Sequence, residues 1–294
     1  MKKNIIYKIL AIIFMIASAI FYNVYTDDES NTNFRLEDNN GSLEIQYIDV
    51  GQADCILIRV DNEYALIDAG NNKDGKKLVN YFNELGITKF RHVFGTHAHE
   101  DHIGGMDSII KNFKITNYYM PDVSTTTKSF EDVIDALDKN NIKYKTPTTK
   151  STYKLGNASI KVLYVGNDSE DLNENSIILR LTYYNTSYLF TGDAPYYTEN
   201  TLLDKDIESD VLKVSHHGST YSSSNEFITK VNPKYSIISV GKNNDYNLPK
   251  EKTLNKLKSV NSKIYRTDEK GTIIVKSDGN NIKISSKKTD TNGD

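Results

Sequence analysis

Residues 96–102 read Thr-His-Ala-His-Glu-Asp-His, and the six positions from His97 hold three imidazoles and the carboxylate of Asp101. Neutral imidazole nitrogens and carboxylate oxygens are the donors that zinc and similar divalent ions prefer. His97 and His99 are two apart, so both rings can point to one side of an extended segment. Asp101 and His102 follow at the start of an expected helix, where the chain can face a second ion. The spacing predicts a metal site for two ions rather than a chance group of solvated histidines.

A second histidine cluster lies far along the chain, and an aspartate stands between the two clusters. Five of the six histidines belong to these clusters, the second being His216-His217 before a glycine. Between them an apolar run ends on Thr-Gly-Asp193. A carboxylate that ends a strand can bridge two metals held by other residues, so Asp193 is the expected bridge. Adjacent residues of an extended chain point oppositely. We therefore expect only one of the two to bind metal directly, and the residues leave open which; we favour His217, with His216 then facing substrate phosphate or the first metal.

The pattern His97-x-His99-x-Asp101-His102, the turn before Asp193 and the His216-His217 pair resemble the metallo-β-lactamase superfamily. Three further stretches, at 47–54, 215–219 and 239–243, resemble the extracellular hydrolase domain of ComEC, the DNA-uptake channel protein of competent bacteria. The match runs in order from about 42 to 285. It implies an α/β fold, the αββα sandwich of this superfamily, in which two sheets pack between helices.

The resemblance also implies the roles of the residues. His97 and His99 would hold the first ion, and Asp101, His102 and His217 the second. Asp193 would hold both ions, which are zinc or manganese. The bound metals would supply hydroxide for in-line attack on phosphorus, and the candidate catalytic residues are Asp101, His216 and Lys242.

Several polar residues are expected around the metals without binding them directly. Asp49, Gln52 and Asp54 form the opening motif of the resembling domains, and such loops line the site. Asp68 ends an expected strand. For Asp54 and Asp68 two interpretations stay open, turn capping and orientation of the histidines. Ser219 is interpreted as a phosphate-contacting hydroxyl, because no free base remains to activate it as a nucleophile.

Two positions depart from the pattern of the relatives. A histidine that often completes the first metal's ligands would fall just before Ser176, where this chain has Asn175. Asparagine is a weak donor, so the first ion would keep an extra water or bind loosely, and fewer nitrogen ligands favour manganese. A later histidine is replaced by Asn247, which removes a candidate general acid.

Alternation of apolar and polar residues, together with turn residues, gives the elements that must position these groups. Each metal-binding segment is expected to follow a strand. Strands are expected at 43–48, 55–60, 64–68, 91–95, 115–120, 143–145, 153–154, 159–165, 176–183, 187–190, 210–215, 235–240, 263–267, 271–277 and 281–285. Helices are expected at 76–85, 106–111, 130–140, 226–230 and 250–257.

Residues 1–25 begin with lysines and continue as an apolar stretch, which predicts a membrane anchor or a signal peptide. A polar linker is expected at 26–42, the hydrolase domain at 43–285 and a disordered tail at 286–294. The domain would then be extracytoplasmic, either anchored to the membrane through its N-terminal helix or secreted. Cys55 is the single cysteine, so no internal disulfide can form.

Charge argues against general attraction to nucleic acid. The formal net charge of −3 includes three lysines before residue 25, so the remainder carries −6. One basic run exists, since residues 250–288 contain eleven Lys or Arg against four acids. Such a run is most often a solvated face, and contact with a polyanion is the second interpretation.

The metal-type residues and the N-terminal segment predict an extracytoplasmic metal-dependent hydrolase, and the resemblance to ComEC implies a phosphodiesterase or nuclease acting on DNA. A first alternative is an esterase for a cell-envelope phosphodiester, such as choline phosphate on teichoic acid, because related secreted hydrolases share the His-His-Gly motif. A second is a surface binding module without activity, which the full set of metal-type residues disfavours. Hydrolysis of β-lactams is disfavoured by Asn175. The sequence does not indicate an oligomeric state.

Overall fold

The structure is a computed structural model that describes residues 42–166 and 168–288. The expected anchor or signal segment at 1–25, the linker up to residue 41 and the tail from 289 lie outside the described residues. Within the described part, helices long and apolar enough to cross a membrane are absent.

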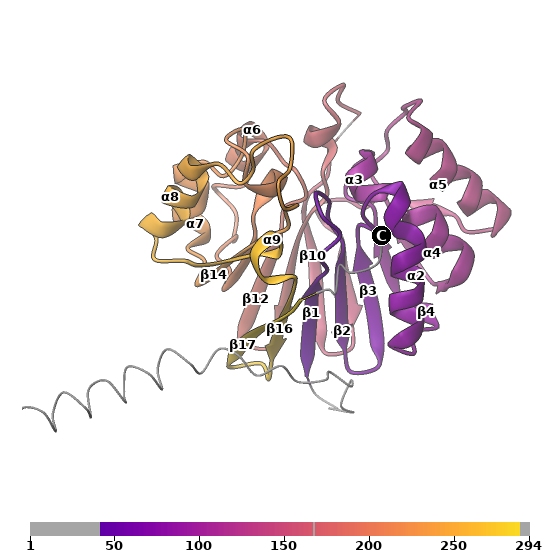
Figure 1. Ribbon diagram of the computed structural model, residues 1–294, viewed down its shortest axis with the longest axis horizontal. Helices are drawn as coiled ribbons and strands as arrows, with labels where there is room; N and C mark the ends of the chain where they lie inside the picture. The colour runs from indigo at the N-terminus through magenta and orange to yellow at the C-terminus, as the bar shows by residue number, and fades with distance from the viewer. Residues whose placement is uncertain (1–41, 167, 289–294) are drawn as a thin grey trace, which may run out of the picture. The chain divides into compact units, whose positions relative to one another are not determined.

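The described strands form two large sheets and one small one (Figure 1). The first sheet has the order β17-β16-β1-β2-β3-β5-β7-β8, the second the order β15-β14-β13-β12-β11-β10-β9, and β4 pairs with β6. The bounds are β1 Leu43–Tyr47, β2 Ile56–Val60, β3 Glu63–Ile67, β4 Lys89–Phe90, β5 His92–Phe94, β6 Lys114–Ile115, β7 Tyr118–Tyr119, β8 Tyr144–Lys145, β9 Thr152–Leu155, β10 Ala158–Tyr164, β11 Ile178–Tyr183, β12 Thr186–Phe190, β13 Val211–Lys213, β14 Tyr235–Ile238, β15 Lys263–Arg266, β16 Thr272–Ser277 and β17 Ile282–Lys287.

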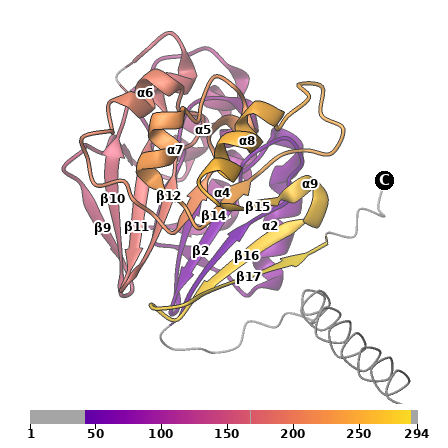
Figure 2. The same ribbon diagram turned by 90° about the vertical axis from the view of Figure 1, so that its left-hand side faces the viewer.

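Helices cover the outer face of each large sheet. In Figure 1, α2, α4 and α5 lie on one side and α6, α7 and α8 on the other, and Figure 2 shows the second group in front of its sheet. The bounds are α2 Gly75–Glu84, α3 Glu100–Ile103, α4 Met106–Asn112, α5 Lys128–Lys139, α6 Tyr196–Asn200, α7 Asn225–Val231, α8 Glu251–Ser259 and α9 Thr267–Lys270, with short 3₁₀ helices η1 Asn72–Asp74, η2 Leu172–Asn175 and η3 Ser215–Gly218. The expected αββα sandwich is therefore the observed fold.

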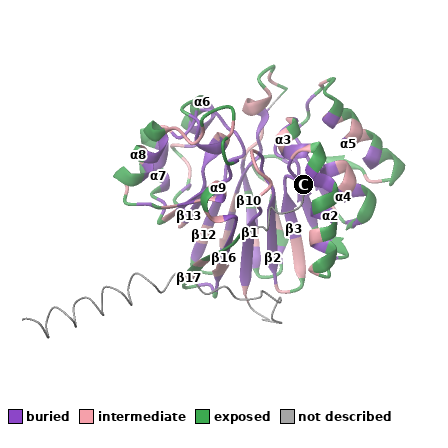
Figure 3. Cartoon of the chain, viewed as in Figure 1, coloured by how far each residue is buried: buried purple, intermediate pink, exposed green. Residues whose placement is uncertain are grey.

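Three apolar cores hold these layers together, and β2 shows how one strand serves two of them. Ile56, Ile58 and Val60 lie in the core between the two sheets, whereas Leu57 lies in the core beneath α2, α4 and α5. Side chains alternate between the faces of a strand, and both faces of this sheet are covered. The inner strands are consequently buried on both sides (Figure 3). Burying one such aliphatic side chain contributes about 1.5–3 kcal/mol.

Most expected elements are present, with differences at places where local pattern carries little information. The expected strand at 115–120 is two short strands, β6 and β7, which pair with different sheets. The chain bends between them, where the Asn117 side chain donates to the Arg91 carbonyl over 3.2 Å. The one-turn helices α6 and α9 were not predicted, because four or five residues show no helical periodicity. Strand β17 continues to Lys287, two residues past the expected domain end at Ser285.

Candidate metal centre

The sequence segments expected to bind metal all follow strands that run in the same direction within their sheet. Strands β3 and β5 are parallel neighbours in the first sheet, and β12, β13 and β14 are parallel in the second. The carboxyl ends of parallel strands meet at one edge of a sheet, where ligand sites form. In Figure 1 the short helices α3 and α6, which follow β5 and β12, both lie at the upper ends of the strands.

Four residues from three separate loops converge at this edge. One donor atom from each of Asp101, His102, Asp193 and His217 lies within 4.8 Å of the others. His102 Nε2 is 3.3 Å from Asp193 Oδ1, and His217 Nε2 is 3.3 Å from Asp101 Oδ2 and 3.6 Å from Asp193 Oδ2. His102, Asp193 and His217 are buried, and Asp101 is half-buried. The arrangement offers two imidazole nitrogens and two carboxylates to one point.

The ring orientations of His102 and His217 are fixed by oxygen acceptors at Nδ1, on the side of each ring away from the cluster. His102 Nδ1 lies 2.8 Å from Asp68 Oδ2, and the Thr96 amide and hydroxyl donate to the same carboxylate over 2.8 and 2.7 Å. His217 Nδ1 lies 2.8 Å from the Ser239 carbonyl oxygen. An oxygen acceptor at Nδ1 places the ring proton there and leaves the lone pair on Nε2 for a metal. Of the two interpretations open for Asp68, the geometry favours orientation of the histidine.

His97 and His99 form a neighbouring pair. His97 Nε2 lies 3.0 Å from His99 Nδ1, and the rings of His97 and His102 have centroids 4.1 Å apart. Thr96 Oγ1 lies 3.1 Å from His97 Nδ1, which places the ring proton there and leaves the lone pair of His97 on Nε2, the atom that faces His99. Burial lowers the pKa of His97 well below its usual value, so this ring is neutral and can donate its lone pair. The two histidines therefore provide a second donor group beside the first.

Glycines allow the loop after these histidines to approach its neighbours. A Cβ on Gly104 would lie 2.3 Å from the Asn72 amide nitrogen, and one on Gly105 would lie 2.4 Å from the Ala69 carbonyl oxygen. Larger residues would push the metal-binding loop away from the loop that carries Asp68.

A buried lysine that the sequence reading overlooked lies behind the cluster. Lys213 ends β13, is 0% exposed and forms an ion pair with Asp54, which is 1% exposed. Its Nζ also lies 3.7 Å from Asp193 Oδ1 and donates to the Gly192 carbonyl over 3.2 Å. The available signal was a charged residue inside the apolar run 211–214, just before the histidine pair. Asp54 Oδ1 lies 3.7 Å from His217 Nδ1, so Asp54 belongs to the surroundings of the cluster rather than to a surface turn.

Electrostatics couple these groups strongly. Burial opposes ionisation of Asp193, but the neighbouring His102 and His217 hold its pKa well below the usual value. Burial likewise opposes the charged form of His102, but Asp193, Asp68 and Asp101 raise its pKa well above the usual value. Asp193 is therefore ionised and protonated imidazole balances it when no cation is bound, whereas burial raises the pKa of Asp68. A divalent cation must displace such protons when it binds.

Two atoms at the centre of the cluster support its fit to a metal. His102 Nε2 and Asp193 Oδ1 are fully buried, and although they lie 3.3 Å apart, neither makes a well-aligned hydrogen bond within residues 42–166 and 168–288. Buried polar atoms without partners are costly, and a bound ion is one accepted explanation for them. Imidazole and carboxylate donors fixed by surrounding acceptors match zinc and manganese chemistry. The residues therefore fit divalent cations.

The histidine pair does not have the backbone that the sequence suggested. The expected strand at 210–215 ends at Lys213, and η3 holds His216 and His217 with φ of 51° and 50°. The different directions of the His216 and His217 side chains therefore arise from a left-handed turn. The prediction attributed them to the alternation of side chains along an extended chain, which was wrong. His217 points into the cluster, while His216 keeps 28% of its side chain exposed and has Nε2 3.8 Å from Asp193 Oδ2. Strained backbone of this kind is concentrated at functional sites.

The remaining expected site residues lie at the rim or hold loops in place. Gln52 Oε1 accepts from the Gly241 amide over 3.0 Å, and Asp49 Oδ1 accepts from the Gly51 amide over 3.2 Å. The Ser219 hydroxyl accepts from the Tyr221 amide over 3.3 Å. Lys242 is exposed in the loop after β14, and within residues 42–166 and 168–288 no ion pair joins it to the cluster.

Asn175 has a structural position in place of the missing histidine. Its Oδ1 accepts from the Ser169 amide over 2.9 Å, and its Nδ2 donates to the Ser169 carbonyl over 2.8 Å. The side chain therefore closes its own loop instead of offering a donor to the metals. The next residue, Ser176, was overlooked: its hydroxyl accepts from the Asp193 amide over 3.2 Å and lies 3.5 Å from His97 Nδ1.

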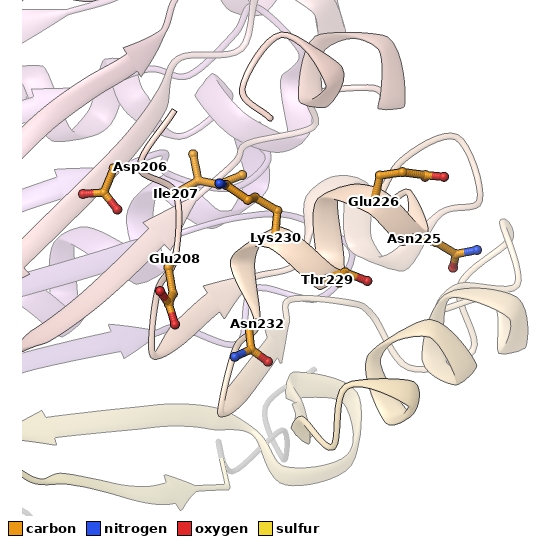
Figure 4. A pocket seen from close by; sticks show the side chains of 8 residues that line it. All are labelled: Asp206, Ile207, Glu208, Asn225, Glu226, Thr229, Lys230 and Asn232. Carbon is orange, nitrogen blue, oxygen red and sulfur yellow. The ribbon is translucent and has the colours of Figure 1, made fainter. Parts of the chain in front are cut away.

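A hollow of about 650 Å³ lies elsewhere, between residues 206–208 and α7 (Figure 4). Its lining includes Asp206, Glu208 and Glu226 against one lysine, Lys230. This acidic hollow includes none of the four clustered residues Asp101, His102, Asp193 and His217, and its negative charge would repel phosphate. It is therefore not a candidate substrate site.

The chain is similar in sequence to several curated competence and recombination proteins. It is 29% identical over 251 residues to ComE operon protein 3 of Bacillus subtilis, covering 78% of this chain and 32% of that protein. It is 26% identical over 230 residues to competence protein ComA of Neisseria gonorrhoeae (76% and 31%) and 26% identical over 239 residues to recombination protein 2 of Haemophilus influenzae (79% and 28%). The chain thus spans about a third of the length of these ComEC-like relatives.

Solved structures share the fold. The metallo-beta-lactamase fold protein YhfI from Bacillus subtilis matches with a TM-score of 0.57 at 13% identity, covering 80% of this chain and all of that one. CmlA, a diiron beta-hydroxylase from Streptomyces venezuelae, matches with a TM-score of 0.53 at 14% identity, covering 78% and 53%. Residues 48–242 match the family described as the Metallo-beta-lactamase superfamily. With its sandwich, its histidine and aspartate cluster and this match over most of its length, the chain belongs to the metallo-β-lactamase superfamily.

Proposed function

We propose that the protein is a metal-dependent phosphodiesterase that acts outside the cytoplasm as a nuclease on DNA. The observation that carries the proposal is the convergence of Asp101, His102, Asp193 and His217 within 4.8 Å, beside the His97-His99 pair. The names of the relatives support DNA as the substrate, because competence and recombination are both processes of DNA. The apolar N-terminal segment supports the location.

Each donor has a defined part in this proposal. His97 and His99 would hold one ion, Asp101, His102 and His217 the other, and Asp193 both. Bound zinc or manganese would supply a water of lowered pKa and offset charge on the phosphate oxygens. The chain itself fixes the donors, through Asp68 behind His102, Ser239 behind His217 and Thr96 behind His97.

Formal charge favours two ions over one. Asp54, Asp68, Asp101 and Asp193 contribute four negative charges and Lys213 one positive charge, which leaves −3 with neutral histidines. One divalent ion would leave −1 and repel a phosphodiester anion, whereas two would leave +1 and attract it. Lys213 therefore supports substrate binding from behind the metals, without contact with the substrate.

His216 and Lys242 are the candidate groups on the substrate side. His216 is accessible next to Asp193, and burial lowers its pKa, so a neutral ring can hydrogen-bond a phosphate oxygen or a water. Lys242 is exposed in a loop at the same edge, which Gln52 fixes through the Gly241 amide. Its mobile ammonium would act as a point charge on phosphate.

The test is hydrolysis by the purified protein with manganese or zinc. We expect turnover of bis-p-nitrophenyl phosphate and of single-stranded DNA, and loss of both in His99→Ala and Asp101→Ala. The loss should exceed the 10–100-fold decrease that is typical of residues outside the direct ligand set. Asp135→Ala is the matched control, because this aspartate is 71% exposed on α5 and pairs only with Lys139 among the described residues.

The outcomes separate the alternatives. Cleavage of a choline-phosphate ester without cleavage of DNA would replace the nuclease by the cell-envelope esterase. If the protein neither takes up metal nor hydrolyses any of these substrates, the surface binding module without activity would be the remaining interpretation. Location is tested separately, by digestion of the domain with added protease in intact cells. Protection from that protease would contradict the extracytoplasmic assignment.

A further inference from the structure

The large apolar side chains that are exposed in the described chain are all tyrosines, and most lie at one edge of the sandwich. They are Tyr144, Tyr184, Tyr196, Tyr197, Tyr221 and Tyr246. The last four lie in segments that follow β12, β13 and β14, the strands that carry Asp193 and the histidine pair. Single exposed aromatic residues are common. Four beside one candidate catalytic centre require an explanation.

Three of these tyrosines are attached to the turn that presents His217. The Tyr221 amide donates to Ser219 Oγ over 3.3 Å, and the Tyr196 amide donates to the Tyr221 carbonyl over 2.9 Å. The Lys250 amide donates to the Gly218 carbonyl over 3.0 Å, and its ammonium donates to the Tyr246 carbonyl over 2.7 Å. The backbone segments of Tyr196, Tyr221 and Tyr246 are thus joined to the turn that carries His217.

The segments that carry these rings are internally fixed. In the loop of Tyr246, the Asn244 side chain donates to the carbonyls of Gly241 and Leu248 and accepts from the Leu248 amide. Tyr197 differs from the other three, since its hydroxyl donates to Asp171 over 3.0 Å and holds α6 to another loop. Tyr196, Tyr221 and Tyr246 are 50%, 71% and 67% exposed, and the Tyr196 ring contacts the Tyr197 ring edge-on with centroids 5.2 Å apart. The three rings therefore remain open to solvent.

The chemistry of these rings indicates what they bind. A phosphodiester chain held at the metals would pass these segments, and open aromatic rings can stack on planar groups of the chain. Nucleobases are such groups in single strands, whereas duplex DNA keeps its bases stacked inside. The part of the chain beyond residue 25 carries a formal charge of −6, so binding of a polyanion away from the metals would gain from an uncharged interaction such as stacking. Rings spread over three segments also differ from the closed aromatic cage that recognises a quaternary ammonium.

We propose that Tyr196, Tyr221 and Tyr246 form a base-stacking rim that makes single-stranded nucleic acid the preferred substrate of this centre. The inference rests on the proposed function for its substrate class. It adds the residues that recognise that class and the preference for unpaired bases.

The test measures binding to the manganese-loaded protein with phosphorothioate strands, which resist cleavage, so that the metals can hold the phosphates while turnover plays no part. Fluorescence anisotropy compares a labelled 15-residue oligothymidine with an abasic strand of equal length and the same phosphates. We expect the base-containing strand to bind at least about fivefold more tightly. Tyr221→Ala and Tyr246→Ala should weaken that binding by roughly 5- to 150-fold, the range for loss of one stacked base. Tyr221→Phe should retain it, because the ring remains.

Tyr184→Ala is the matched control, since Tyr184 is 61% exposed and lies at the turn between β11 and β12. Equal binding of the two wild-type strands would overturn the inference without any variant. So would alanine variants that keep the preference for bases, or binding of phosphocholine that these variants abolish. A wild-type protein that shows tyrosine-dependent binding but cleaves no phosphodiester would remove the proposed function and leave the rim standing.

Discussion

Replacing Lys213 with methionine keeps most of the side-chain volume and removes an ammonium group buried between Asp54 and Asp193. At 3.7 Å and an effective dielectric constant of about 20, attraction to Asp193 alone amounts to about 4 kcal/mol. Desolvation offsets part of this, but loss of one partner leaves the other charge buried and unpaired. That situation costs about 3–5 kcal/mol. We expect the free energy of unfolding of Lys213→Met, measured without metal, to fall by that amount.

The assay is urea unfolding followed by far-ultraviolet circular dichroism in the presence of a chelator. The double variant Asp54→Asn/Lys213→Met removes both charges, so it should lose about 2 kcal/mol less than the sum of the single losses. Lys234→Met is the matched control. Lys234 lies 2.8 Å from Asp210 but is 73% exposed, so its removal should change stability by less than about 1 kcal/mol.

Bound metal should stabilise Lys213→Met more than the wild type, which is opposite in sign to the effect of the substitution without metal. Without the ammonium the centre is more negative, so divalent cations should bind more tightly and raise the stability of Lys213→Met more than that of the wild type. Phosphodiester binding should weaken, because the doubly loaded centre loses its positive charge. The reasoning would be refuted if Lys213→Met lost less than about 1 kcal/mol without metal, or if the losses of the two single variants added up in the double variant. Either result would show that the Asp54–Lys213 ion pair does not stabilise the fold as argued.

Three further outcomes follow from the geometry. Asp68→Asn removes the carboxylate that holds His102, so metal affinity should fall about 10–100-fold in chelator competition, and an unchanged affinity would exclude this role. His217→Ala should lose one bound ion in elemental analysis while His216→Ala keeps the wild-type content; the reverse pattern would exchange their roles. Glu199 lies on α6, is buried and accepts from the Ser223 and Ser224 amides, and its burial raises its pKa from 4.5 to about 7. Between these values the folded chain keeps a proton that the unfolded chain has released, so the free energy of unfolding should fall by up to about 3 kcal/mol as the pH rises. Glu199→Gln should flatten that dependence in denaturation measured from pH 5 to 8, and a parallel profile would show that Glu199 does not titrate there.

Some elements of the fold could be predicted from the sequence, and others could not. Strands such as β2, with apolar residues on both faces, were predictable because burial imposes a pattern that neighbours along the chain display. The short helix α6 and the division between β6 and β7 were not, since both depend on contacts with distant segments. The anchor expected at 1–25 lies outside the described residues and stays a prediction.

The sequence by itself determined which donors the centre contains and how they are grouped. His97, His99, Asp101 and His102 are held close by the covalent chain, whatever the rest of the fold does. Tertiary structure alone decided that Asp101 meets His217, 116 positions away, and that Lys213 neutralises Asp54 behind them. It also decided the left-handed turn that sends His217 inward and leaves His216 exposed. The physical reason is that spacing fixes only local neighbours, whereas the burial of charge and the direction of a side chain depend on how separate strands end at one edge.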